Sequence, residues 1–530
     1  MTVTTGAPRV RRRGRAAGRG PGVVLTLAVL GSVAVATLPL WYLLVRAVGG
    51  LDRAASILGR PGFGTAALTS LALAVVVGAG ALVVGTATAW IVGRTRLRGR
   101  RAWAVLLLLP LAVPSYVAAY GWVSLAPWFS GFWAAALVLV ASTAPYVALP
   151  VFAALSRGEA GLEEVARSLG AGPMEVLRTV TLPAVRPAAL AGTLLAMLYA
   201  LSDFGAVAIL RVDTLTRSVY ASYSSAFDRT AAVLQSLVLI ACAVVLVLAE
   251  QRLRGRTGSR VSTSVPRPVP AAGLPAAGRI AALALLVGTV VLSLAVPAVA
   301  LVLRLLQGMR GGVDGGELVS ALAGSAWVAL LGTVLAVLLA LPVAVVAARF
   351  PGRLSRIVEV ASFSGHALPG VVVGLSLVFV TLNALPALYQ SVAALALAYA
   401  VLFLPKAIGS SRAAIESVPV SLEHVSRASG RGPLATFVSV TARLSAPGIA
   451  AGALLVMVTA MKELPATLML RPTGLETLAT ELWSRTEVAA YGAAAPYAVA
   501  LVALAAVPAT LLARGVRLPD LATTDGEVTR

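Results

Sequence analysis

Two stretches of the chain nearly repeat each other: LEEVARSLGAGP runs from Leu162 to Pro173, and LEHVSRASGRGP runs from Leu422 to Pro433. The offset is 423 − 163 = 260 residues, and it continues without a gap to the AGTLLAM that begins at Ala191 and the AGALLVM that begins at Ala451. Self-similarity at a fixed offset is the mark of an internal duplication. The sequence therefore predicts two homologous halves.

The composition of the chain is that of a membrane protein. Of its 530 residues, 59% are hydrophobic and 12% are charged, whereas soluble domains carry about 25% charged residues. Apolar runs of about 20 residues, enough to cross a bilayer as helices, recur along the chain. Lipid offers the backbone no hydrogen-bond partners, so each run must be helical. We expect an all-α integral membrane protein with about 12 transmembrane helices in two six-helix repeats of parallel topology.

The expected spans fall into two sets of six. The first set lies near 23–46, 65–92, 103–126, 131–155, 187–210 and 233–250. The second set lies near 280–303, 319–348, 357–382, 387–410, 448–470 and 493–514. The expected domains are a basic N-terminus (1–22), a first half (23–254), a linker (255–278), a second half (279–514) and a C-terminal tail (515–530).

Arginine marks one side of the membrane. If every span crosses once, the basic N-terminus, the loop from Arg94 to Arg101, the linker and the segment from Arg349 to Arg356 share that side. Cytoplasmic loops retain positive residues, so both termini and the linker are expected in the cytoplasm. The first apolar run is too long for a signal peptide and has no cleavage site, so we expect it to be retained as a span of a multi-pass cytoplasmic-membrane protein.

Several other classes of function have little support. The net charge of +22 comes from arginines between apolar runs without interleaved aromatic residues, so nucleic acid is not an expected partner. The single Cys242 cannot form an internal disulfide, and His366 and His424 lack ligand-like spacing, so no metal site is expected. The sequence contains no nucleophile and base pair, so the chain is not expected to be an enzyme.

Nucleotide chemistry is also expected to lie elsewhere. The chain has two lysines, Lys406 and Lys462, and neither belongs to a GxxxxGK[ST] phosphate-binding loop. We therefore expect the chain to bind no cofactor and a partner to hydrolyse any ATP.

The repeated block begins between the fourth and fifth expected spans of each half. Residues Leu162 to Leu169 have helical composition with acidic residues at the start, which favours a helix N-terminus. Gly170, Gly172 and Pro173 interrupt that helix before a second amphipathic stretch, Met174 to Val180. A bent protrusion on the cytoplasmic side is predicted, and we interpret it as a docking surface rather than a simple connection.

The first block resembles the EAA loop of ATP-binding-cassette (ABC) importer permeases, on Glu164-Val165-Ala166, Gly170 and Val180-Thr181-Leu182-Pro183. In that family the loop forms a coupling helix seated in a cleft of the ATPase subunit. The second copy departs from the pattern at His424-Val425-Ser426 and Ala442-Arg443. The resemblance implies coupling residues Glu163, Glu164, Ala166, Gly170, Gly172, Leu182 and Pro183 in the first loop (159–186), and Glu423, Val425, Gly430 and Gly432 in the second (411–446).

A second segment narrows the resemblance. MKELPATLMLRP, from Met461 to Pro472, is similar to the segment typical of ferric-iron permeases that work with an extracytoplasmic binding protein. The resemblance implies a permease served by that binding protein and by two copies of an ATPase subunit that uses ATP and Mg. Fused thiamine and phosphonate permeases share the architecture. A major-facilitator transporter is the rival class, but the loop from Gly93 to Arg101 lacks the acid typical of it.

Two acidic residues stand at equivalent positions, since 463 − 203 = 260. Ionisable residues within membrane spans indicate function. We hypothesise that Asp203 and Glu463, in the outer part of each fifth span, line the translocation path, where two carboxylates would suit ferric iron. The alternative is that Arg211 and Lys462 neutralise them near the interface.

Overall fold

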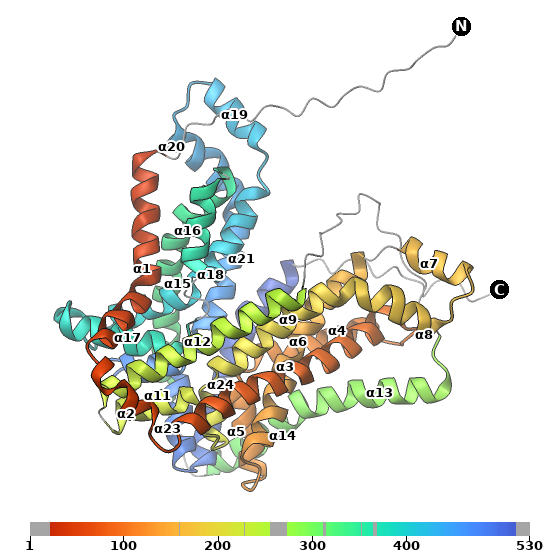
Figure 1. Cartoon of the computed structure of the whole chain (residues 1–530), viewed down its shortest axis with the longest axis horizontal. Helices are drawn as coiled ribbons and strands as arrows, with labels where there is room; N and C mark the ends of the chain where they lie inside the picture. Colours follow the sequence, from red (N-terminus) through yellow and green to blue (C-terminus); the bar gives the residue numbers. More distant parts are fainter. Residues whose placement is uncertain are drawn as a thin grey trace.

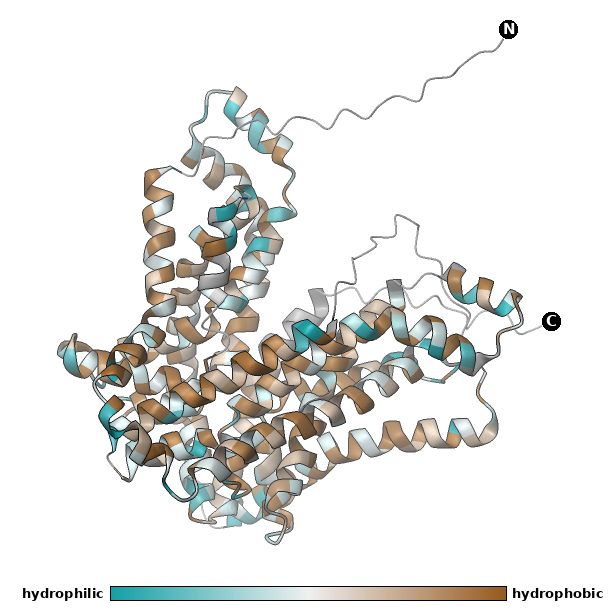
Figure 2. Cartoon of the chain, in the orientation of Figure 1, coloured by the Kyte–Doolittle hydropathy of each residue, from teal (hydrophilic) through white to brown (hydrophobic). Residues whose placement is uncertain are grey.

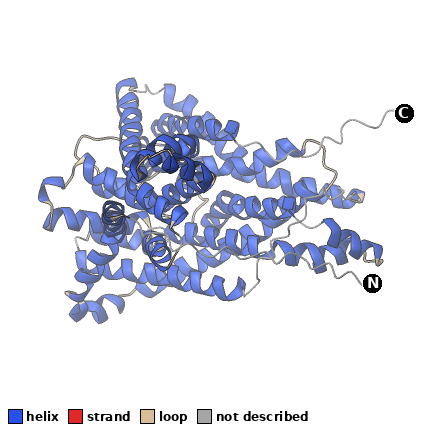
Figure 3. Cartoon of the chain, turned by 90° about the horizontal axis from the view of Figure 1, so that it is seen from above, coloured by secondary structure: helices blue, strands red, loops and turns tan. Residues whose placement is uncertain are grey.

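The computed structural model describes residues 22–157, 160–226, 228–254, 273–310, 314–350, 352–363 and 368–515, and their regular structure is helical (Figure 3). The first half contains α1 (Val23–Val48), α2 (Leu51–Leu58), α3 (Phe63–Arg94), α4 (Arg100–Leu108), η1 (Leu109–Ala112), α5 (Ser115–Leu125), α6 (Phe132–Arg157), α7 (Ala160–Ser168), α8 (Pro173–Val176), η2 (Leu177–Thr181), α9 (Leu182–Ser202), α10 (Gly205–Ile209), α11 (Leu215–Ser224) and α12 (Arg229–Arg254).

The second half repeats this order. It contains α13 (Ala276–Val290), η3 (Val291–Ala295), α14 (Val296–Arg310), α15 (Gly315–Arg349), α16 (Arg353–Phe363), α17 (Gly370–Asn383), η5 (Pro386–Leu388), α18 (Val392–Glu416), α19 (Val420–Ala428), α20 (Pro433–Thr436), η6 (Phe437–Ala442), α21 (Arg443–Ala460), α22 (Pro465–Leu470), α23 (Leu478–Glu487) and α24 (Tyr491–Gly515).

The helices account for the expected number of spans. Within the described ranges, nine helical stretches are long and apolar enough to cross a membrane, and the bent pair that ends in α5 makes a tenth. Two shorter apolar helices, in α17 and α24, stand where the remaining two spans were expected. Hydrophobic residues predominate along the long helices, and hydrophilic residues gather at α19 and at the loops (Figure 2). The predicted all-α membrane fold is confirmed.

Four spans are interrupted where continuous helices were expected. The third bends by 93° before α5, and the ninth ends with α16 and resumes at α17. The helices α5 and α17 each begin after a proline, Pro114 or Pro369, with φ of −60°. Proline fixes φ and lacks an N–H, which suits a helix start but not a helix interior. The fifth and eleventh spans end early, at Ser202 and Ala460.

The long helices form two bundles that diverge toward two separate protrusions (Figure 1). One bundle, with α3, α6 and α9, leads to α7 and α8, and the other, with α15, α18 and α21, leads to α19 and α20 (Figure 1). The first helix of each half crosses over: α1 packs against α15, α16 and α17, and α13 packs against α3 and α4. The crossing is fixed in part by Asn383, whose Nδ2 donates to the Tyr42 hydroxyl over 3.0 Å. The halves are therefore interlocked.

Glycines allow the helices within each bundle to approach closely. A Cβ on Gly192 of α9 would lie 2.5 Å from the carbonyl oxygen of Tyr146 in α6. A Cβ on Gly452 of α21 would lie 2.1 Å from Oγ of Ser410 in α18. Small residues at such contacts are typical of membrane helices. The repeated AG dipeptide of the sequence thus lies at a contact between equivalent helices in both halves, α9 with α6 and α21 with α18.

Candidate functional site

The repeated block folds into a protruding helix and a turn in each half. Gly170 follows α7 with φ of +90°, and Gly430 follows α19 with φ of +84°. Only glycine adopts this left-handed backbone without a steric cost. The N–H of Ala171 then bonds the carbonyl of Ala166, and that of Arg431 bonds the carbonyl of Ser426, over 3.0 and 3.3 Å. These bonds close the helix ends and explain why both copies keep the glycine.

The chain after the turn differs from the predicted separate amphipathic stretch. The helix restarts at Pro173 or Pro433, which occupies a first-turn position suited to proline. It passes through π-helical segments, η2 and η6, directly into α9 and α21. The stretch Met174 to Val180 is therefore the beginning of the fifth span and not an independent helix. Wide π turns at matching places are often functional sites.

Glu163 of α7 lies at the centre of a buried ion-pair cluster. Its side chain is 7% exposed, and its Oε1 lies 3.2 Å from Nη2 of Arg94, the last residue of α3. Arg167 approaches Oε2 over 3.1 Å, and the Thr181 hydroxyl donates to Oε1 over 3.1 Å. Glu163 therefore joins three elements: the protruding helix, the end of α3 and η2.

Glu423 of α19 makes the same arrangement in the second half. Nε of Arg349, the last residue of α15, lies 2.8 Å from its Oε1. The Thr441 hydroxyl donates to Oε1 over 2.9 Å, and Arg427 lies 3.7 Å from Oε2. Arg349 also donates to the carbonyl of Val418 over 3.0 Å. A partner-binding role was predicted for Glu163 and Glu423, and both carboxylates face the chain's own arginines.

The outer surfaces of α7 and α19 carry exposed apolar side chains at equivalent positions. Leu162 and Val165 are 55% and 53% exposed, and their counterparts Leu422 and Val425 are 44% and 66% exposed. Exposed apolar patches on a protruding element mark interaction sites. Of the remaining predicted coupling residues in the two protrusions, Ala166 is half-buried. The others are exposed: Glu164, Gly170, Gly172, Gly430 and Gly432.

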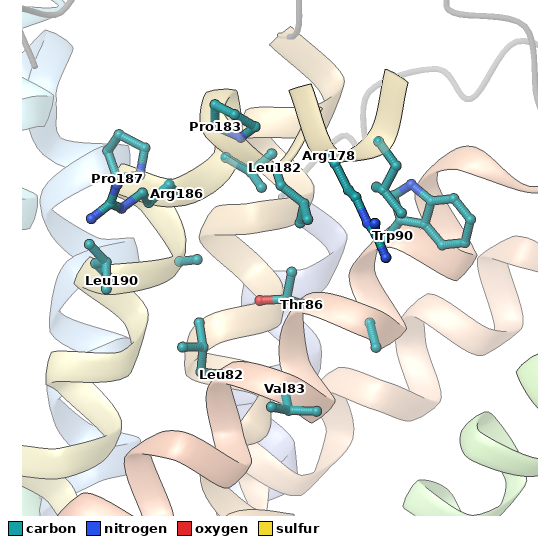
Figure 4. Close-up of a pocket in the computed structure, with 14 residues that line it drawn as sticks. Leu82, Val83, Thr86, Trp90, Arg178, Leu182, Pro183, Arg186, Pro187 and Leu190 are labelled. Carbon is teal, nitrogen blue, oxygen red and sulfur yellow. The ribbon is translucent and has the colours of Figure 1, made fainter. Parts of the chain in front are cut away.

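Leu182 and Pro183 lie apart from that outer surface, at the start of α9. They line a groove of about 790 Å³ between α3 and α9 (Figure 4). Trp90 and Arg178 stand at one end of the groove (Figure 4). The fold therefore divides the predicted coupling residues between a protruding surface and this groove.

A cavity of about 510 Å³ lies where the two bundles meet, and both halves line it. Asp203 and Glu463, predicted as a pair from the repeat alone, both face this cavity. The other polar groups on its wall are Ser115, Tyr116, Ser142, Tyr146, Tyr199, Ser202, Lys406, Thr459 and Lys462.

The two acids were expected within the outer part of each fifth span. They instead follow the ends of those spans and cap the next short helices. Asp203 follows α9, and its Oδ1 accepts the N–H groups of Ala206 and Val207 over 2.9 and 3.2 Å. Its Oδ2 accepts the hydroxyl of Ser115. Glu463 follows α21, and its Oε1 accepts the N–H of Ala466 over 3.1 Å. Carboxylates at these positions satisfy the free N–H groups of a helix start.

The expected neutralising partners do not pair with these acids. Arg211 is exposed, and Nζ of Lys462 donates to the carbonyl of Leu111 over 3.0 Å. No ion pair of Asp203 or Glu463 occurs among the residues that the structure describes. Across the same ranges, no group of three or more His, Cys, Asp and Glu side chains could hold a metal ion. His366 lies outside the described residues.

Sequence reasoning used Arg94 and Arg349 only to orient the chain. Their spacing, 349 − 94 = 255, is close to the 260 of the repeat and identifies them as equivalent residues, but their pairing with Glu163 and Glu423 is visible only in the fold. The same spacing relates Ser115 to Gly370, since 370 − 115 = 255.

The family emerges from comparison with known proteins. Residues 81–258 and 332–517 each match the model described as "Binding-protein-dependent transport system inner membrane component". The chain belongs to this family. Each matched segment contains one of the repeated blocks, so the predicted duplication of an ABC-type permease unit is confirmed. The major-facilitator interpretation is set aside.

Relatives agree with this assignment. The chain is 33% identical over 498 residues to the Fe(3+)-transport system permease protein FbpB 2 of Haemophilus influenzae, a match that covers 93% of this chain and 98% of the relative. It is 30% identical over 200 residues to the sulfate transport system permease protein CysW of Synechocystis, covering 33% of this chain and 71% of the relative. A probable molybdenum ABC transporter permease protein of Haloferax volcanii is 30% identical over 198 residues, covering 35% of this chain and 73% of that relative.

Proposed function

We propose that this chain is the membrane permease subunit of an ABC importer for ferric iron delivered by an extracytoplasmic binding protein. The similarity to the Fe(3+)-transport permease carries this proposal, because it extends over 93% of the chain and 98% of that relative. The sulfate and molybdenum relatives match about a single half. Thiamine and phosphonate permeases of the same fused architecture supply the alternative substrates.

ATP is used by a partner, with Mg, and this chain binds no cofactor. Two copies of the ATPase subunit dock on the two protrusions, one on α7 and one on α19. The matching exposed pairs, Leu162 with Val165 and Leu422 with Val425, support two similar docking surfaces. Departure of the second block from the family pattern at His424 makes the two contacts unequal in detail.

Both termini lie in the cytoplasm, and α7 and α19 project from the cytoplasmic side. The support is the arginine distribution, because Arg94 and Arg349, which end α3 and α15, belong to the positively charged loops that membrane proteins retain inside. The binding protein then docks on the opposite side.

The buried glutamates transmit the motion of the ATPase. Ion pairs of Glu163 with Arg94 and of Glu423 with Arg349 link each protrusion to the end of a long helix. When the ATPase subunits close, each protrusion moves with α3 or α15, and the diverging bundles tilt about their junction. The bundles thus alternate between two arrangements. A ligand shifts the equilibrium between them only by binding one arrangement more tightly, and ATP and the loaded binding protein are the ligands that do so here.

The cavity at the junction is the proposed translocation path, with Asp203 and Glu463 on its wall. Its position between the halves supports this role, since transporters of two repeats hold substrate at the repeat interface. Asp203 and one oxygen of Glu463 accept hydrogen bonds from neighbouring residues. These bonds hold the two acids in place on the cavity wall, so the acids also shape the cavity.

Uptake by the reconstituted importer tests this function. Proteoliposomes that hold the permease and its ATPase should accumulate ⁵⁵Fe from the loaded binding protein only when ATP is enclosed on the ATPase side. Excess thiamine or phosphonate should not compete. Uptake of thiamine or a phosphonate in place of iron would contradict the ferric assignment, and uptake without ATP would contradict the ABC mechanism.

A further inference from the structure

Lysine is rare in this chain, and both lysines line the same cavity. Lysine and arginine together number 43, so Lys406 and Lys462 stand beside 43 − 2 = 41 arginines. Lys406 comes from α18 and Lys462 follows α21, yet each faces the cavity at the junction of the bundles. Lysine presents a compact charge with three rotatable donors, unlike the planar fork of arginine. Their placement puts two mobile positive charges on the wall of one cavity.

Neither ammonium group has a carboxylate partner within ion-pair distance in the described part of the chain. Nζ of Lys406 lies 3.3 Å from the Thr459 hydroxyl and 5.5 Å from the centre of the Phe403 ring. Nζ of Lys462 donates to the Leu111 carbonyl over 3.0 Å. Each ammonium carries three N–H groups, so both retain donors for a ligand in the cavity.

The acids of the cavity are already engaged as helix caps. Asp203 accepts from Ser115 and from two backbone N–H groups. Glu463 accepts from Ala466 and interacts electrostatically with Lys406 from beyond ion-pair distance. The cavity therefore offers more free hydrogen-bond donors of positive charge than free carboxylate oxygens. The two acids and the two lysines balance in number, but an anion is the ligand that would accept from the free N–H donors of both ammonium groups.

We infer that Lys406 and Lys462 form a binding site for an oxyanion, a phosphate or carboxylate group, which crosses the membrane together with the ferric ion. This inference rests on the proposed function, since iron is the cation that such an anion would accompany. The oxyanion bonds the lysines and shields them from the metal's charge. Hydrogen bonds between an ammonium group and an oxyanion are stronger than those between neutral groups.

A double-label uptake experiment tests the inference in the assembled importer. The binding protein is loaded with ⁵⁵Fe together with either ³²P-orthophosphate or ¹⁴C-citrate, and both labels are counted inside proteoliposomes. One anion label should enter in constant ratio to iron. Entry of ⁵⁵Fe without either anion label would overturn the inference. Entry of an anion supplied only in the outer buffer, independently of iron, would also contradict it.

Lysine variants supply the residue-level test. The change Lys406→Gln with Lys462→Gln should lower uptake of both labels by about tenfold or more, as expected for lost bonds to a charged group. Lys406→Arg with Lys462→Arg keeps the charges and should retain most uptake. Each variant must co-purify with the ATPase, and the single changes serve if the double variant does not assemble. Unchanged uptake in the glutamine variant would contradict the inference.

Direct binding separates failure of this inference from failure of the iron assignment. If the unaltered importer takes up no ⁵⁵Fe, the iron assignment fails. Equilibrium binding of ³²P-orthophosphate and ¹⁴C-citrate to the purified permease still tests the lysine pair. Binding that is lost with glutamine and kept with arginine supports an oxyanion site. Equal binding to the glutamine variant, or no binding at all, overturns it.

Discussion

Nε of Arg349 lies 2.8 Å from Oε1 of Glu423, and this contact joins the last residue of α15 to the first turn of α19. The equivalent contact in the first half joins Arg94 to Glu163. Both glutamate side chains are 7% exposed, so the ion pairs are buried beneath the outer faces of the protrusions. A protrusion held in this way moves as one body with a membrane helix.

Removal of a buried charge should uncouple the protrusion from its helix. Glu423→Ala leaves the Arg349 guanidinium with backbone carbonyl partners but without its carboxylate, and breaking a buried ion pair typically costs about 3–5 kcal/mol. We expect a lower melting temperature of the complex and fewer substrate molecules imported per ATP hydrolysed. Thermal unfolding and paired uptake and hydrolysis assays provide the measurement.

Asp213→Asn is the matched control for this change. Asp213 pairs with Arg217 but is 84% exposed, and exposed pairs contribute about 0–1 kcal/mol. The control should leave both assays close to those of the unaltered protein. A Glu423→Ala variant with unaltered melting temperature and coupling ratio would refute the proposed linkage.

The apolar outer faces of α7 and α19 should bind the ATPase subunits. Val165→Asp or Val425→Asp places a charge on a contact surface, and loss of a central interface contact typically costs about 2 kcal/mol or more. Co-purified ATPase should fall by about tenfold or more at limiting concentration. Val165→Ile and Val425→Ile keep apolar surfaces and should retain the partner. Full retention of ATPase by both aspartate variants would exclude these faces as docking surfaces.

Close contact at Gly192 should make that position sensitive to a single methyl group. The Cβ of Gly192→Ala would lie 2.5 Å from a backbone oxygen of α6, and overpacking of this kind costs about 1–3 kcal/mol. Gly288→Ala is the control, because nothing lies within 4 Å of its added Cβ. Thermal unfolding should show a lower melting temperature for Gly192→Ala only. Equal melting temperatures would contradict the packing described for α6 and α9.

The first residue of α5 and of α17 lies beside an acid of the cavity, and the two halves use different residue pairs at this contact. Ser115 donates to Asp203 in the first half, while in the second half a Cβ on Gly370 would lie 2.4 Å from Oε1 of Glu463. The longer glutamate thus occupies space that a serine side chain would need. Gly370→Ser should displace this Glu463 oxygen from the Ala466 N–H, and loss of one such hydrogen bond costs about 0.5–1.5 kcal/mol.

Shortening the acid should relieve that clash. Gly370→Ser combined with Glu463→Asp rebuilds the pair found in the first half, and the double variant should regain most of the lost melting temperature. Thermal unfolding of the two single variants and the double variant measures the coupling between the positions. Strictly additive losses would show that the two sites are not equivalent.

Much of the fold could be predicted because the signals are local. Long apolar runs specify membrane helices, and the 260-residue offset identifies the duplication and pairs Asp203 with Glu463. Gly170 and Gly430 mark turns because the left-handed backbone at both positions favours glycine. Each of these features can be identified from short stretches of sequence, either taken alone or compared at the fixed offset.

What could not be predicted depends on contacts between distant segments. The hydroxyl that Asp203 accepts belongs to Ser115, 88 residues earlier in the chain. The partners of Glu163 and Glu423 come from the ends of α3 and α15, 69 and 74 residues away by 163 − 94 and 423 − 349. The exchange of α1 and α13 between bundles likewise leaves no mark in hydropathy.

The most direct test measures the distance between the protrusions during the ATPase cycle. Spin labels at Ser168→Cys and Ser429→Cys, in a Cys242→Ser background, report on the exposed ends of α7 and α19. In the assembled importer, the distance distribution should shift to shorter values when ATP is trapped and return after hydrolysis. A distribution that stays the same while ATP is hydrolysed and substrate is imported would contradict the account.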